Sequence, residues 1–111
     1  EMGMAAVKKT DIPEIACFMQ DYWEFKKSVW VVEEGDGYWQ DAIARASELG
    51  KKYQQDLCQA EINVFMDYLE WTDEKKHGKT ELGFNRWLYM RYARRAELEG
   101  KGRTEQEGTN R

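Results

Sequence analysis

Apolar residues recur at helical spacing from Trp39 to Trp71 without a slip in phase, and no other feature constrains the fold as strongly. Residues three and four positions apart share one face of an α-helix, so this stripe predicts helix along its whole length. Asp36 is expected to cap the start of the helix. Gly50 interrupts the composition but not the phase; one bent helix and two helices both fit, and we favour a break near 50–56. The stripe comprises Trp39, Ala42, Ile43, Ala46, Leu49, Tyr53, Leu57, Ala60, Val64, Tyr68 and Trp71.

The segment 57–71 carries a second apolar face beside the first. A helix that is apolar most of the way round normally lies at the centre of a bundle. We therefore predict that 57–71 is the central helix, on which the other helices pack. The additional apolar residues are Cys58, Ile62, Phe65, Met66 and Leu69.

Two further helices are expected on either side of this region. Asp11 and Glu14 form a capping box ahead of an apolar pattern that predicts helix over 12–29. Gly78 is a natural helix-terminating residue, and Thr80 is expected to cap a last helix over about 81–98.

No strand pattern appears, so the predicted class is all-α, a single-domain bundle of three or four helices over 11–99. The segment 1–10 is predicted to be a flexible N-terminus. The glycine-rich polar segment 100–111 lacks periodicity and is predicted to be a disordered tail.

Composition excludes several classes of protein. The 111 residues include two cysteines and one histidine, and the formal net charge is −4. No stretch approaches the roughly 18 apolar residues that span a membrane. The start of the chain lacks a signal-peptide pattern, and two cysteines form at most one disulfide. We expect a small cytoplasmic protein of a bacterial host cell, without contact to a membrane.

Residues that could carry catalysis or bind a metal lack their usual partners. Glu74 and His77 match half of a di-iron motif, but the chain has no second histidine. Cys17 falls on the polar side of its helix among carboxylates, which disfavour a thiolate, and Cys58 falls on an apolar face. We therefore predict no enzyme activity, no metal and no cofactor.

Charge is divided unevenly along the chain. Residues 1–75 contain 16 acidic and 8 basic residues, a net charge of −8, whereas 76–111 contain 9 basic and 5 acidic residues, a net charge of +4. Opposite charges in the two parts suggest two different surfaces for a partner.

The first candidate surface is acidic. An acidic helical face can occupy the basic channel of a nucleic-acid-binding protein. Trp71 is expected to lie partly packed beneath this face; the alternative is a surface that only aids solubility. The residues are Asp67, Glu70, Asp73 and Glu74.

The second candidate surface is an arginine-rich helix that could follow a phosphate backbone of DNA or RNA, or bind a protein. We place it on the side of the helix away from Phe84 and Tyr92. In the alternative interpretation, these arginines pair internally with the acidic face. The residues are Arg86, Trp87, Arg91, Arg94 and Arg95.

A third hypothesis is self-association as a homodimer or larger homo-oligomer. The apolar arc of helix 12–29 covers nearly half its circumference and includes Trp23 and Trp30, with Lys26 near its middle. Either the lysine extends along the apolar surface to reach water, or the end of the helix leaves the core. In the second case the two tryptophans are contact candidates.

Several segments together resemble small uncharacterised helical proteins carried by phages and mobile elements of Gram-positive bacteria. This resemblance, over about 12–75, implies an accessory role, since such proteins often bind and block a host protein; anti-CRISPR proteins are one such class. Our leading hypothesis is a non-catalytic protein that occupies the surface of a host protein, as an inhibitor of a nucleic-acid-handling or CRISPR-type defence protein. The segments are 21–24 (DYWE), 37–39 (GYW), 49–53 (LGKKY) and 65–70 (FMDYLE).

Overall fold

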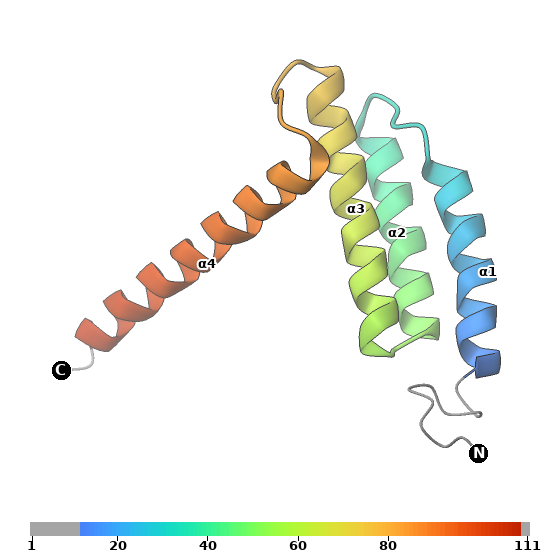
Figure 1. Cartoon of the computed structure of the whole chain (residues 1–111), viewed down its shortest axis with the longest axis horizontal. Helices are drawn as coiled ribbons and strands as arrows, with labels where there is room; N and C mark the ends of the chain where they lie inside the picture. The colour runs from blue at the N-terminus through green and yellow to red at the C-terminus, as the bar shows by residue number, and fades with distance from the viewer. Residues whose placement is uncertain (1–11, 110–111) are drawn as a thin grey trace. The chain divides into compact units, whose positions relative to one another are not determined.

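The chain is all-helical, as predicted. The computed structural model describes the backbone of residues 12–109 and the side chains of residues 14–100. Within that range there are four helices and no strand (Figure 1). They are α1 (Ile12–Val29), α2 (Asp36–Lys52), α3 (Asp56–Lys76) and α4 (Phe84–Thr109).

The chain divides into two compact units whose boundary falls inside α3. The first unit ends at Leu69, and the second begins at Glu70. We describe each unit by itself. The predicted flexible segment 1–10 lies outside the described residues.

Helix α1 has the predicted bounds, and its end is fixed by a side chain from α2. The Tyr38 hydroxyl donates a hydrogen bond of 2.6 Å to the carbonyl of Val29, one of the last carbonyls of α1 that lack a partner within the helix. The segment after α1 is extended, and its Val32 is buried. These two contacts attach the connection between α1 and α2 to the core.

The N-cap of α2 is Gly35, and the prediction that Asp36 caps this helix is wrong. Gly35 has φ +98° and ψ 162°, a conformation that residues with a Cβ rarely adopt, and no side chain caps the helix. Asp36 lies in the first turn instead, where its negative charge faces the positive end of the helix dipole.

The predicted break near 50–56 is confirmed: α2 ends at Lys52 and α3 begins at Asp56. Tyr53 leaves the helix with an extended backbone (φ −126°, ψ 93°), yet its side chain is only 4% exposed. The Gln59 side-chain amide donates hydrogen bonds of 2.8 Å to the carbonyls of Gly50 and Tyr53. The apolar stripe keeps its phase because Tyr53 still contributes its ring to the core.

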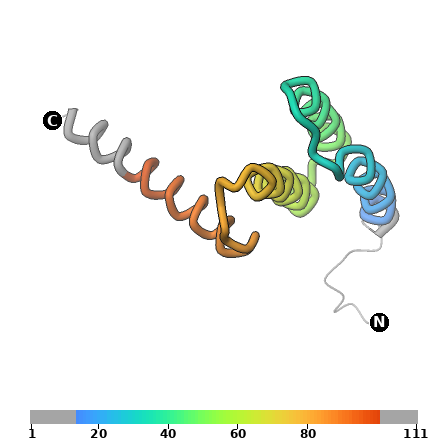
Figure 2. The backbone as a smooth tube through the Cα atoms, turned by 90° about the horizontal axis from the view of Figure 1, so that it is seen from above, coloured from blue at the N-terminus to red at the C-terminus, as the bar shows by residue number. Residues whose placement is uncertain are grey.

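The core of the first unit is rich in aromatic rings, several of which pack around Phe65. The rings of Tyr22, Phe25 and Trp30 lie between 5.6 and 6.4 Å from it, in contacts that hold α1 against α3. Seen end-on in Figure 2, α1, α2 and the first part of α3 surround a common centre. The buried apolar residues are Phe18, Tyr22, Phe25, Val29, Val32, Ala42, Leu49, Tyr53, Cys58, Ile62, Phe65 and Leu69.

Helix α3 ends at the predicted glycine in a Schellman motif. Gly78 has φ +69°, its N–H donates to the carbonyl of Lys75, and the N–H of Lys79 donates to the carbonyl of Glu74. These two bonds satisfy carbonyls that have no partner within the helix.

The prediction that Thr80 caps the last helix is wrong. The Thr80 hydroxyl accepts a hydrogen bond of 3.2 Å from the N–H of Leu82, which makes a local turn, and α4 begins three residues later than predicted, at Phe84. The first N–H of the helix ladder, that of Trp87, donates to the carbonyl of Gly83. At its other end α4 continues past the predicted residue 98 to Thr109, into the segment predicted to be a tail.

None of the described helices combines the length and the apolar character needed to cross a membrane.

Candidate partner-binding surface

The predicted acidic face is not one exposed surface. Asp67 is only 8% exposed, and Glu70, Asp73 and Glu74 are half-buried. Trp71 is half-buried, as expected, and its indole N–H donates a hydrogen bond of 2.9 Å to the carbonyl of Leu82. The last turns of α3 therefore hold the chain that leads into α4.

Trp87 lies on the inner side of α4, so its predicted place on the side away from Phe84 is wrong. Its ring is 7% exposed and stacks on that of Phe84, with centroids 6.2 Å apart. Its indole N–H donates a hydrogen bond of 3.0 Å to a carboxylate oxygen of Glu74. This bond satisfies the one polar atom of a buried ring.

Arg91 follows Trp87 by one helical turn and forms an ion pair with Glu70. Its guanidinium also lies over the Trp87 ring, 5.1 Å from the centroid. Internal pairing of the arginines with the acidic residues, one of the two interpretations left open by the sequence, is thus found for Arg91. We call the set that joins α3 to the start of α4 the clasp: Glu70, Trp71, Glu74, Phe84, Trp87 and Arg91.

Beyond the clasp, α4 exposes both cations and large apolar side chains. Tyr89 is 73% exposed, Met90 53% and Leu98 60%, and all three lie among exposed arginines. Arg95 lies over the Tyr92 ring, 5.3 Å from its centroid. Arg86, Tyr89 and Met90 lie at helical positions on the side of α4 away from Phe84, and Arg94 lies one turn beyond Met90, on the flank of the helix. We call this group the outer face of α4: Arg86, Tyr89, Met90 and Arg94.

A groove of about 580 Å³ runs beside the outer face, wholly within the second unit. Met90 and Arg94 belong to both surfaces, and Glu97 lines the groove as well. Cationic, anionic and apolar groups therefore meet within one short stretch of α4. The lining residues are Glu74, Trp87, Met90, Arg91, Ala93, Arg94 and Glu97.

On α1, Lys26 takes the first of its two predicted alternatives. Its ammonium lies 4.4 Å from the ring centroid of Tyr22 and 5.9 Å from that of Trp23. Phe25 and Val29 are buried, so the end of α1 remains in the core. Trp23 and Trp30 are nevertheless about half exposed, at 51% and 48%.

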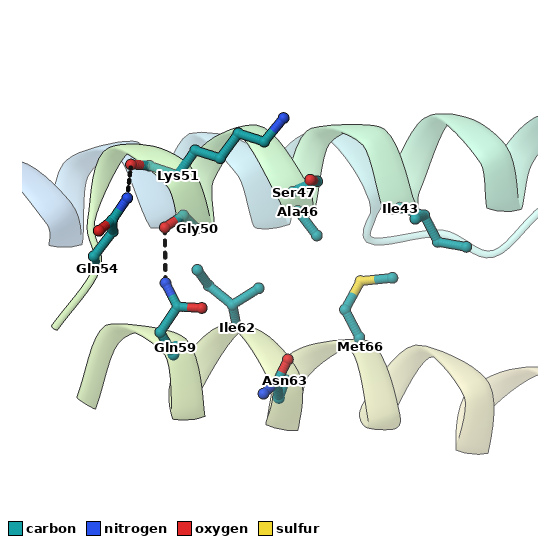
Figure 3. A pocket seen from close by; sticks show the side chains of 10 residues that line it. All are labelled: Ile43, Ala46, Ser47, Gly50, Lys51, Gln54, Gln59, Ile62, Asn63 and Met66. Atoms are coloured by element: carbon teal, nitrogen blue, oxygen red, sulfur yellow. Dashed lines mark hydrogen bonds between the residues drawn. The ribbon is translucent and has the colours of Figure 1, made fainter. Parts of the chain in front are cut away.

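A second groove, of about 680 Å³, lies between α2 and α3 in the first unit (Figure 3). It exists because α2 presents small residues, Ala46, Ser47 and Gly50, toward Ile62 and Met66 of α3. The apolar periodicity of the sequence did not predict this groove, because small residues in the helix do not interrupt that periodicity.

The side chains considered for catalysis or metal binding lie in different surroundings. Cys17 is exposed and Cys58 is buried, and this burial raises the pKa of the Cys58 thiol. The Nδ1 atom of His77 lies 2.8 Å from the carbonyl of Asp73, while Glu74 is engaged by Trp87. Among the residues described, no three or more His, Cys, Asp or Glu side chains are grouped so that they could hold a metal ion.

No family model, curated protein or solved structure matches this chain. The resemblance to phage and mobile-element proteins stays a prediction.

Proposed function

We propose that this chain is a non-catalytic binding protein that occupies the surface of another protein, and that α4 makes the contact. The observation that carries this proposal is the outer face of α4, where Tyr89 and Met90 lie exposed between Arg86 and Arg94. Arginine, tyrosine and methionine are enriched in the buried centres of interfaces. Arginine and tyrosine also contribute much of the binding energy there.

The clasp favours α4 over the acidic residues as the contact surface. Glu70 is paired with Arg91, and Glu74 accepts the Trp87 indole N–H. Drawing these carboxylates into a partner would break bonds that hold α4 to α3. Arg86 and Arg94 are exposed, so a partner can reach them without that loss.

The chemistry of the outer face indicates the kind of partner. A partner surface that carries both apolar side chains and carboxylates would complement this face. Its apolar side chains would pack on Tyr89 and Met90, and its carboxylates would pair with the guanidinium groups. Nucleic acid is the alternative partner, bound through Arg86, Arg94 and Arg95. Glu97 lines the adjoining groove and Glu99 is exposed, and both would repel phosphate groups. These two carboxylates favour a protein partner.

The resemblance described above suggests the partner: a host protein in the cytoplasm of a Gram-positive bacterium. An inhibitor of a nucleic-acid-handling or CRISPR-type defence protein is the form of this function that we propose.

We also propose that 57–71 is the central helix of the fold. Phe65 supports this, since the rings of Tyr22, Phe25 and Trp30 all pack against it. Leu69, one turn further along, is fully buried.

The test is affinity capture from a Gram-positive lysate, treated with nuclease, on the wild-type chain and on two matched charge-reversal variants. Arg86→Glu with Arg94→Glu alters the outer face. Arg45→Glu with Lys51→Glu changes the net charge equally on exposed positions of α2. We expect at least a tenfold loss of the captured protein for the first variant and little loss for the second, because reversal of a contact charge costs several kcal/mol.

Three results would contradict this proposal. Equal losses from both variants would indicate a general charge effect, and no loss from the outer-face variant would remove α4 from the contact. Retention of nucleic acid alone, with binding that weakens steeply as salt rises, would favour the nucleic-acid alternative.

A further inference from the structure

A second group of exposed apolar side chains lies on the first unit, along the side formed by α1 and α3. Met19, Trp23 and Trp30 on or directly after α1 are 48%, 51% and 48% exposed. On α3, Leu57 is 64% and Val64 40% exposed. We call this surface the α1–α3 face.

Side-chain contacts join α1 and the residue after it to α3 at several points of this face. The Tyr22 hydroxyl donates a hydrogen bond of 2.8 Å to the carbonyl of Glu61, near the middle of the face. Further along, the ring of Trp30 lies 5.8 Å from that of Phe65 and 6.0 Å from that of Tyr68. The exposed side chains of α1 and α3 therefore belong to one continuous surface.

The apolar area of this face is enough for a weak interface with a second face of equal area. A tryptophan presents up to about 250 Å², so the exposed halves of Trp23 and Trp30 together offer roughly 250 Å². Met19, Leu57 and Val64 bring the apolar area to roughly 500 Å², which is in the range of the largest patch on a typical monomer, a patch that is often functional. Two such faces in contact would bury roughly 1,000 Å², the lower limit for a specific interface.

The charges on this face complement one another when it meets a copy of itself. Lys26 lies on the α1 side, and Glu61 lies on the α3 side, level with Tyr22. A two-fold axis parallel to the helices would place α1 of each copy against α3 of the other. That arrangement brings Lys26 of one copy to Glu61 of its partner twice, once on each side of the axis.

We propose that the α1–α3 face binds a second copy of this chain and forms a weak, symmetric homodimer. Trp23 and Trp30 make the apolar contact, and the two Lys26–Glu61 pairs fix its register. This dimer is independent of the function proposed above, which uses α4.

The test is sedimentation velocity on the full chain, from about 1 µM to about 1 mM, a range that covers weak interfaces of this size. We expect a reversible monomer–dimer equilibrium within this range. Trp23→Ala should raise the dissociation constant at least about tenfold, as truncation of a central tryptophan usually does. The matched control is Ile43→Ala, which removes a side chain of similar exposure (57%) on α2.

Charge exchange tests the register. Lys26→Glu and Glu61→Lys should each weaken the dimer, and the two changes together should restore it, because they exchange the partners of the same pair. Circular dichroism and a thermal melt on every variant separate loss of the dimer from loss of the fold.

Several results would overturn the assignment. The first is a monomer at every concentration, and the second is an equal effect of Ile43→Ala and Trp23→Ala. A dimer that Arg86→Glu with Arg94→Glu dissociates, and Trp23→Ala does not, would place self-association on α4. A double charge variant as weak as the single ones would exclude the proposed register.

Discussion

The Tyr53 hydroxyl donates a hydrogen bond of 2.7 Å to the Asp21 carboxylate, and the Lys52 ammonium donates one of 2.8 Å to the same oxygen. One carboxylate of α1 thereby receives two donors from the end of α2 and the residue that follows it. These bonds lower the pKa of Asp21 and raise those of Lys52 and Tyr53. The connection at 53–55 is thus fixed to α1 by polar bonds as well as by burial.

Asp21→Asn should lower the denaturation midpoint at pH 7. Because the folded-state pKa of Asp21 lies below its ordinary 3.8, its contribution is present above about pH 4 and is lost as pH falls through the folded-state value. The difference between wild type and variant should therefore shrink toward pH 2. Urea denaturation at both pH values measures it. Asp41→Asn, which breaks an exposed pair with Arg45, is the control and should have little effect at either pH.

Tyr22 should make the fold sensitive to alkali. Burial, with a smaller contribution from the charge of Glu61, raises the pKa of Tyr22 to about 12. A group whose folded-state pKa is raised stabilises the fold below its unfolded pKa, near 10, and this contribution is lost as pH rises through 12. Tyr22→Phe should abolish this loss, of the order of 2 kcal/mol, and cost about 1 kcal/mol at pH 7 through the missing hydrogen bond to Glu61.

Denaturation at pH 7 and pH 11, with an ultraviolet titration of the phenols, measures both effects of Tyr22→Phe. Tyr89 is 73% exposed, so Tyr89→Phe should change neither. An unchanged alkaline profile in Tyr22→Phe would mean that another group governs it.

Gly50 and Gly78 should respond oppositely to alanine. Gly50 lies inside α2, where a Cβ would meet only the flexible Gln59 side chain, at 3.4 Å, so Gly50→Ala should stabilise the fold by about 0.5–1 kcal/mol. Gly78 has φ +69°, so Gly78→Ala should destabilise it by about 1 kcal/mol. Thermal melts of both variants measure these changes in stability. Stabilisation by both substitutions would contradict the left-handed backbone at Gly78.

Trp87→Ala should loosen α4 while leaving the first unit folded. It removes the stack on Phe84 and the hydrogen bond to Glu74, which together hold the first turns of α4. Amide hydrogen exchange should lose protection at 84–91 and retain it in α1 and α2, because local units open separately. Tyr89→Ala is the control on the exposed side of the same helix. Equal loss of protection in both units would show that the clasp supports the whole chain.

The period of the apolar residues predicted the class and the bounds of α1, and the interruption of composition at Gly50, not the period, marked the break between α2 and α3. These features depend on local spacing and local composition, which the sequence displays directly. The start of α4 was missed because Thr80 is a good capping residue whose hydroxyl instead closes a turn with Leu82. A threonine hydroxyl can cap a helix or close a turn, and the conformation of the surrounding backbone determines which it does.

The side of α4 on which Trp87 lies could not be read from the helix alone. Aromatic residues occur on several sides of α4, and the buried one is selected by Glu74 and Phe84. The hydrogen bond to Glu74 joins residues in different helices, so no periodicity within α4 reveals it. This contact engages Glu74 internally, and the ion pair with Arg91 does the same for Glu70.

The five tryptophans are divided between the two units: Trp23, Trp30 and Trp39 precede Leu69, and Trp71 and Trp87 follow it. Their surroundings range from half exposed at Trp23 to buried beside a carboxylate at Trp87. Each unit therefore contains tryptophans whose intrinsic fluorescence can report on it. Replacing the tryptophans of one unit by phenylalanine would leave fluorescence that reports only on the other, so that the opening of each could be timed without an added dye.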